Sequence, residues 1–190
     1  MLVWAVVALS PNLLLADSSP QVLAEGQGQS GPKQPQAFVS ADGTVDVVFA
    51  VGDEIRVSTS RDRGESFTRA AGSIRCPNMP AGMRRGPRIV RTKSALVVTA
   101  IGGKQGKGRD GDVLAWHSTD NGATWSEAVM VNDAPDAARE GLHGMTAGAN
   151  GEVWCVWLDL RNSKSEIFTA VSSDDGQTWK GNVRAYRSPD

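Results

Sequence analysis

Three copies of one short pattern constrain the fold of this 190-residue chain more than any other feature. Each copy reads Ser-x-Asp-x-Gly-x-x-(Trp or Phe), and the interval from Asp62 to Asp120 is nearly the same as that from Asp120 to Asp174. A fixed period of this kind is typical of repeat architectures, in which every unit packs against its neighbours. The chain is therefore predicted to be a row of similar units. The pattern residues are Ser60, Asp62, Gly64 and Phe67, then Ser118, Asp120, Gly122 and Trp125, then Ser172, Asp174, Gly176 and Trp179.

The residue types of the pattern suit a tight turn. Ser and Asp side chains bond backbone N–H groups, glycine supplies a positive φ, and the aromatic residue returns the chain to the core. The pattern resembles the Asp box of bacterial neuraminidase repeats, found in sialidases and other β-propellers, and the resemblance covers roughly residues 33–190. It implies an all-β fold, a β-propeller of four-stranded antiparallel blades, with about three blades of a six-bladed sialidase-like parent in this chain. It also implies that the boxes are structural turns.

Alternating apolar and polar residues, bounded by turn residues, predict four strands in each unit, an antiparallel meander. Asp42-Gly43 and Asn150-Gly151 are predicted hairpin turns. The blades are expected at about residues 35–75, 84–135 and 139–190, with almost no helix among them. The predicted strands are 36–41, 44–51, 54–60 and 67–71 in the first unit, 88–92, 95–101, 112–118 and 128–132 in the second, and 142–147, 152–159, 166–172 and 182–187 in the third.

The N-terminal residues 1–16 are apolar and resemble a signal peptide, and residues 17–34 form a polar linker. They predict a secreted or periplasmic protein. The positive n-region of a signal peptide is absent, because the first Lys or Arg is Lys33, and a misassigned start or a truncated gene end is the alternative. Pro11 and Asn12 interrupt the apolar run, so it is too short for a membrane span.

Composition is that of a soluble globular protein, with 40% hydrophobic residues and a formal net charge of −1. The absence of a basic excess argues against a nucleic-acid partner. Cys76 and Cys155 lack metal-ligand spacing, and Cys155, in an apolar strand, is predicted to be a buried free thiol. His117 and His143 have no third ligand at metal spacing. We therefore expect no metal and no cofactor.

A meander places its first and third turns at one end of a blade, and its second turn and the link to the next blade at the other. The Asp boxes occupy the first end. Arginines and carboxylates collect at the opposite end of the second and third units, whereas the first unit has no such cluster. This end is therefore the predicted site. The residues concerned are Arg84, Arg85, Arg88, Arg109, Asp110, Asp112, Arg139, Glu140, His143, Asp159 and Arg161.

The resemblance to sialidases extends to this end of the blades. The segment Arg85-Gly86-Pro87 is similar to the family's Arg-x-Pro motif, and Asp110 follows in the middle loop of the same unit, ahead of the second Asp box. The resemblance implies that Arg85, or alternatively Arg88, grips a substrate carboxylate and that Asp110 is the catalytic acid. A guanidinium suits a carboxylate because it offers two parallel hydrogen bonds, and a loop Asp can protonate a leaving oxygen if burial raises its pKa.

Arg139 precedes Ser172 by the same interval as Arg85 precedes Ser118, so Arg139, Glu140 and His143 are expected beside the same pocket as substrate-binding residues. For Arg85 and Asp110, an inter-blade salt bridge or a solvated loop charge is the competing interpretation, and for Glu140 a structural role. The single tyrosine, Tyr186, falls in an outer strand, a packing position. Asp159 and Arg161 are expected to form an ion pair.

These features predict a fragment of an exo-α-sialidase-like glycoside hydrolase, whose partner is a glycan or sialylated glycoconjugate and which is inactive by itself. The alternative is a non-catalytic Asp-box propeller that binds glycan or protein, and a hydrolase of another polysaccharide is a third possibility. No specific protein partner is evident. Three blades leave a bare face at each end, so the chain alone is expected to aggregate or unfold at modest temperature.

Overall fold

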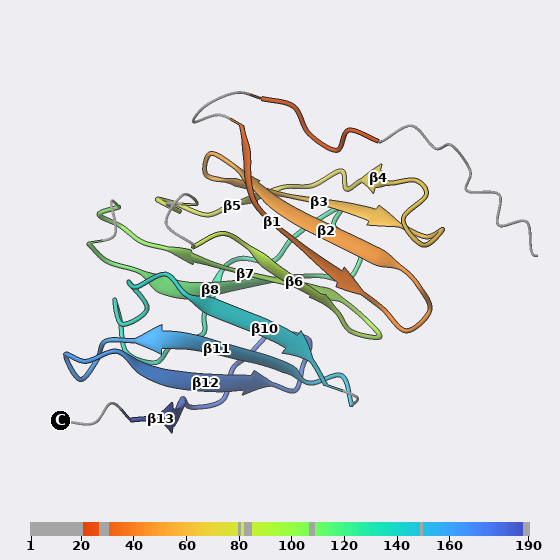
Figure 1. Ribbon diagram of the computed structural model, residues 1–190. Coiled ribbons are helices and arrows are strands. Elements are labelled where there is room, and N and C mark those ends of the chain that lie inside the picture. The colour runs from red at the N-terminus through yellow and green to blue at the C-terminus, as the bar shows by residue number, and fades with distance from the viewer. Residues whose placement is uncertain are drawn as a thin grey trace, which may run out of the picture.

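The structure is a computed structural model that describes residues 21–26, 31–79, 81, 85–106, 109–148 and 150–187. Within these residues the chain forms three antiparallel sheets that stack as successive blades, without an α-helix (Figure 1). The predicted all-β architecture of four-stranded blades is therefore confirmed. The predicted signal peptide at 1–16 and much of the linker lie outside the described residues. No helix of the described part is long and apolar enough to cross a membrane.

The first blade has the strand order β1-β2-β3-β4, and a short strand β5 also pairs with β3. Its strands are β1 (Pro32–Val39), β2 (Val45–Val51), β3 (Glu54–Ser60), β4 (Thr68–Arg69) and β5 (Ile74–Arg75). The outer strand predicted at 67–71 is present as the shorter β4, and β5 was not predicted. The chain leaves the ladder at Gly72. There the Gly72 N–H donates to the carbonyl of Gly122 in the second Asp box at 3.0 Å. This contact divides the outer edge into β4 and β5.

The second and third blades are simple meanders, with the orders β6-β7-β8-β9 and β10-β11-β12-β13. The second comprises β6 (Arg88–Arg91), β7 (Leu96–Gly102), β8 (Asp112–Ser118) and β9 (Val129–Met130). The third comprises β10 (His143–Ala147), β11 (Val153–Asp159), β12 (Glu166–Ser172) and β13 (Val183–Tyr186). Predicted bounds agree best for β3, β8 and β12. β1 begins at Pro32, inside the expected linker, and a register shift between Lys33 and Gln36 interrupts its pairing with β2.

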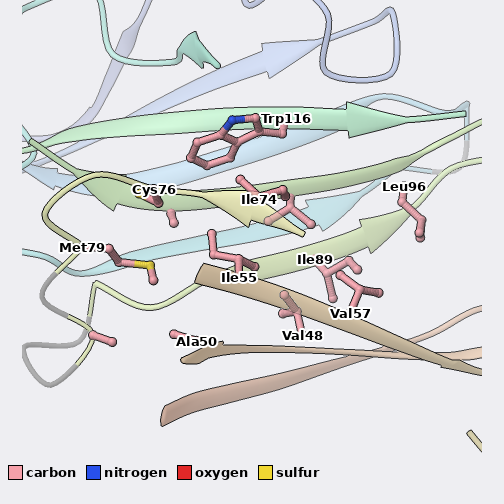
Figure 2. Close-up of a cluster of buried hydrophobic side chains, with 13 residues drawn as sticks. Val48, Ala50, Ile55, Val57, Ile74, Cys76, Met79, Ile89, Leu96 and Trp116 are labelled. Atoms are coloured by element: carbon pink, nitrogen blue, oxygen red, sulfur yellow. The ribbon is translucent and has the colours of Figure 1, made fainter. Parts of the chain in front are cut away.

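The apolar core lies between the blades. Strand β7, at the centre of the stack, is buried along its whole length because a blade covers each of its faces. Figure 2 shows the cluster between the first two blades, and a second cluster joins the second blade to the third. Stacking of blades therefore supplies the apolar burial that a single meander lacks. The first cluster includes Val48, Ala50, Ile55, Val57, Ile89, Leu96 and Trp116, and the second includes Ile101, Val113, Cys155, Trp157 and Phe168.

The three Asp boxes adopt one hydrogen-bonded turn. In each, the serine hydroxyl donates to the aspartate Oδ1 at 2.6–2.7 Å and accepts the glycine N–H at 2.7–2.8 Å. The aspartate Oδ1 also accepts the N–H of the residue four positions later at 2.9 Å. Hydrogen bonds from the box hydroxyls lower the pKa of Asp62 and of Asp120 to about 2. These side chains therefore hold the turn as fixed anions.

Candidate functional site

The end of the blades opposite the Asp boxes brings three of the predicted site residues into direct contact. Arg85 lies in the connection from the first blade to the second, Asp110 in the loop between β7 and β8, and Arg139 in the connection to the third blade. A meander directs all of these segments to the same end. Their meeting therefore follows from topology, and spacing from each Asp box was a valid signal for it.

Arg85 is fully buried and ties these segments together through backbone carbonyls. Its Nη1 donates to the carbonyl of Asp110 at 2.7 Å, and its Nη2 donates to the carbonyl of Arg139. Its Nε has no partner among the described residues. Burial lowers the pKa of Arg85, while the charges of Asp110 and Glu140 act in the opposite direction. The guanidinium in this arrangement positions two loops, and no inter-blade carboxylate salt bridge to it is observed within the described residues.

Asp110 is also buried, and its carboxylate is enclosed by its own loop. It accepts the backbone N–H groups of Lys104 at 2.6 Å, Gln105 at 2.8 Å and Gly106 at 3.2 Å. A Cβ on Gly103 would lie 2.5 Å from its Oδ1, so the loop approaches it as only glycine permits. Burial raises the pKa of Asp110, but the three amides lower it by more, and the net direction is down. The carboxylate is held in its ionised form.

A second pair of predicted residues lies on the innermost strands. Arg88 begins β6 and donates through Nη1 to the carbonyls of Gly86 at 3.1 Å and Pro87 at 2.9 Å. His143 begins β10 and is 7% exposed, and neither of its ring nitrogens has a partner among the described residues. Burial, reinforced by the charge of Arg88, lowers the pKa of His143 to about 3. The imidazole is therefore neutral over the physiological range and offers one donor and one acceptor.

Arg139 and Glu140 are exposed, in contrast to Arg85 and Asp110. None of the hydrogen bonds among the described residues uses the Arg139 guanidinium, whose backbone carbonyl holds Arg85. The charge of Glu140 acts on Arg85, so this carboxylate is close to the buried guanidinium. The structure thus joins Arg85, Asp110 and Arg139 directly, with Glu140 beside them. Arg84 lies outside the described residues.

The other residues singled out in the sequence have structural surroundings. Asp159 and Arg161 form the expected ion pair at 2.9 Å, and the indole N–H of Trp157 donates to Asp159 at 2.8 Å. Cys155 is a buried free thiol as predicted, and burial raises its pKa to about 12. Tyr186 is half exposed on the outer strand β13.

Asn78 was missed from the sequence, although it organises the same end of the second blade. Its side-chain amide donates to the carbonyls of Gly103 and Lys104, both at 3.0 Å. These two hydrogen bonds hold the loop that encloses Asp110 in place. A single Asn after a short strand carries no spacing signal, and nothing in the pattern could have found it. A cavity of about 410 Å³ opens beside it, lined by Pro77, Asn78, Gly102, Gly103, Lys104, Asp112 and Leu114.

Comparisons with known proteins find similarity in structure only. No family model and no curated protein matches the sequence. The structure of a Penicillium chrysogenum α-L-arabinanase with arabinobiose aligns with 83% of this chain, and the alignment covers 50% of the arabinanase, at 16% sequence identity and a TM-score of 0.57. The GH93 α-L-arabinofuranosidase of Fusarium graminearum matches 84% and 50%, at 12% identity and a TM-score of 0.56. A Hadza microbial sialidase matches 80% and 37%, at 18% identity and a TM-score of 0.53.

These similarities establish the fold. The three sheets are blades of the β-propeller type shared by these glycoside hydrolases. The chain spans about half the length of the arabinanase and of the arabinofuranosidase to which it is similar. At these sequence identities, the substrates of the similar enzymes cannot be assigned to this chain.

Proposed function

We propose that the propeller to which these blades belong hydrolyses glycosides, and that its substrate carries a terminal sialic acid or a related acidic sugar. The observation that carries the proposal is the meeting of Arg85, Asp110 and Arg139 at the end opposite the Asp boxes. Solved structures of similar fold include an arabinanase, an arabinofuranosidase and a sialidase, so a glycosidase is the kind of enzyme this architecture supports. The local excess of arginine favours an acidic sugar among their substrates.

The proposed roles follow from burial. The exposed Arg139 offers its guanidinium to a substrate carboxylate, and the half-buried Arg88 adds a second positive charge from the inner strand. Arg85 holds the two loops in place, since both of its Nη atoms already donate to backbone carbonyls. His143 supplies a neutral hydrogen-bonding side chain beside Arg88. Glu140 orients the cluster through its charge on Arg85.

Asp110 remains the proposed acid, although one observation favours a second function. A general acid at neutral pH needs a raised pKa, whereas the amides of its loop lower the pKa of Asp110. Catalysis by Asp110 therefore requires that substrate binding withdraw one or more of these N–H groups. If the loop stays closed, the same cluster serves a non-catalytic propeller that binds acidic glycans. The two functions differ in turnover and share the binding of an acidic sugar.

The test measures binding on the 190-residue chain and turnover on the propeller to which its blades belong. Calorimetry should detect N-acetylneuraminic acid and should not detect the neutral N-acetylglucosamine. Arg139→Ala should weaken binding by about 10- to 100-fold, because a hydrogen bond to a charged group contributes roughly 1.5–3 kcal/mol. Arg61→Ala, which removes an exposed arginine at the Asp-box end, is the matched control and should bind as the wild type does.

Turnover of a fluorogenic sialoside by the propeller to which these blades belong then separates the enzyme from the binding module, because the 190-residue chain is expected to be inactive by itself. With the enzyme, Asp110→Asn should lower turnover by roughly 10²–10⁴-fold. Binding without hydrolysis would select the glycan-binding function. Equal affinity for the neutral sugar, or an Arg139→Ala variant with wild-type affinity, would contradict the proposal as a whole.

A further inference from the structure

Two peptide planes in the loop between β7 and β8 are held from both sides. The N–H groups of Lys104 and Gln105 donate to the Oδ2 of Asp110, at 2.6 and 2.8 Å. The carbonyl groups of the same two planes, those of Gly103 and Lys104, accept the side-chain amide of Asn78, both at 3.0 Å. Both planes are trans, so the C=O and N–H of each point in opposite directions. The hydrogen bonds from Asn78 therefore orient both N–H groups toward Asp110.

Asn78 reaches this loop from the connection that follows β5 of the first blade. The N–H of Cys76 donates to the carbonyl of Asp53, in the turn between β2 and β3, at 2.9 Å. The N–H of Gly103 donates to the carbonyl of Pro77 at 3.1 Å. The connection is thus fixed to the first blade on one side and to the loop on the other, and it places the Asn78 amide against the two carbonyls.

The backbone of Asn78 suits this residue type. Its φ is 52°, in the left-handed region where Asn occurs several times more often than most residues. Its side chain also lies against Gly106, because a Cβ there would be 3.1 Å from the Asn78 Oδ1. Asn78 is exposed and outside the apolar clusters. Its side chain therefore acts on the loop and not on the core.

The N–H groups of this loop oppose the effect of burial on Asp110. Burial raises the pKa of Asp110, and the N–H groups of Gln105, Lys104 and Gly106 lower it by more. Two of these three N–H groups belong to the planes that Asn78 holds. No charge is altered when the Asn78 amide is removed. The charged side chains of the segments packed around Asp110 are those of Arg85, Lys104, Arg109, Asp112, Arg139 and Glu140.

We propose that Asn78 is a positioning residue that sets the protonation state of Asp110 through the peptide planes of Lys104 and Gln105. The carboxylate stays ionised while Asn78 holds both planes, and it becomes a proton donor once these hydrogen bonds are released. The first blade thereby controls the group proposed as the catalytic acid. The consequence for turnover rests on the proposed function, whereas the effect on the ionisation of Asp110 is measured without a sugar.

Asn78→Gly tests the proposal on the 190-residue chain, because glycine accepts the positive φ and removes only the amide. Hydrogen exchange at the N–H groups of Lys104 and Gln105 should become about 5- to 30-fold faster, the lower part of the range for two lost hydrogen bonds. The pKa of Asp110, followed by NMR at its carboxyl carbon and assigned with Asp110→Asn, should rise by roughly 0.7–1.5. This rise is the logarithm of the same factor, because only the ionised form depends on the oriented N–H groups.

Asn121→Gly is the matched control, because Asn121 also has a left-handed backbone, with a φ of 58°, and lies in the second Asp box. This variant should keep the wild-type pKa of Asp110 and wild-type exchange at both loop amides. Faster exchange in Asn78→Gly with an unchanged pKa of Asp110 would overturn the proposal and leave Asn78 a purely structural role. Exchange that accelerates equally at Gly122 and Gly176 of the Asp boxes would also overturn it, because the loss would then be one of global stability.

The same chain separates this proposal from the proposed function. A wild-type chain that does not bind N-acetylneuraminic acid, while Asn78→Gly still raises the pKa of Asp110, would contradict the proposed function alone. Binding of the sugar with an unchanged pKa in Asn78→Gly would contradict the role of Asn78 alone.

Discussion

The residue before each box glycine has a backbone conformation that few side chains tolerate. Arg63, Asn121 and Asp175 have φ values of 62°, 58° and 60°, in the left-handed region. Asn and Asp occur there several times more often than other residues, because their short polar side chains bond locally. Two of the three boxes therefore use a residue type that suits the turn, and Arg63 does not.

Arg63→Asn should accordingly stabilise the chain, by about 0.5–1 kcal/mol, since it relieves left-handed strain at an exposed site. Equilibrium urea unfolding at a fixed protein concentration measures this change. Arg63→Ala is the control, because it removes the same charge and the same contacts but keeps a side chain unsuited to this φ. Equal stability of the Asn and Ala variants would show that backbone strain is not the cause.

For these individual residues, the sequence predicts which site residues lie together, but it does not predict which contacts their side chains make. Spacing from the Asp boxes places Arg85, Asp110 and Arg139 together because spacing reports topology. It carries no information on whether a guanidinium turns to solvent or to a backbone carbonyl. The Arg85 guanidinium donates to two backbone carbonyls, and the Asp110 carboxylate accepts three backbone N–H groups of a glycine-rich loop. Such contacts depend on the course of the loop, which alternation and turn signals do not define.

Between elements, the described blades are joined by the buried ion pair of Asp46 and Arg91, by the more exposed ion pair of Asp133 and Arg161, and by apolar contacts. Asp46 on β2 is fully buried and accepts hydrogen bonds from Arg91 on β6 and from Thr59 on β3. At the next interface, Val97 on β7 and Ala147 on β10 belong to one apolar cluster. Inner and middle strands were predictable because their apolar alternation is strong. The split outer edge of the first blade was not, because its two short strands are exposed or paired over only two residues each.

Arg91→Ala should destabilise the chain by roughly 3–5 kcal/mol, because it leaves the buried Asp46 carboxylate without its partner. The double variant Asp46→Val with Arg91→Ala introduces the residue types of Val97 and Ala147 at the next interface and should recover most of this loss. Urea unfolding of Arg91→Ala, of Asp46→Val and of the double variant, each compared with the wild type, gives the double-mutant cycle that measures this coupling. A double variant as unstable as Arg91→Ala would mean that the charge pair is not interchangeable with an apolar contact here.

For the whole molecule, three Asp-box blades form a stack whose two ends differ in chemistry. Polar turns with fixed aspartates occupy one end, and the buried Arg85 with its associated loops occupies the other. Fold class was predictable because three matching turns in register leave few alternatives. Spacing predicted that Arg85, Asp110 and Arg139 lie at one end, whereas the role proposed for each depends on its burial. The central claim is therefore that an acidic sugar binds at the end opposite the Asp boxes.

Amide chemical shifts of the ¹⁵N-labelled chain, titrated with N-acetylneuraminic acid, test this claim most directly. Glycines mark both ends of the stack: Gly111 and Gly141 flank the loops that contact Arg85, and Gly64, Gly122 and Gly176 mark the Asp boxes. The account predicts saturable shifts at Gly111 and Gly141, none at the box glycines, and none with N-acetylglucosamine. Shifts confined to the Asp-box glycines, or no shifts at either end, would contradict it.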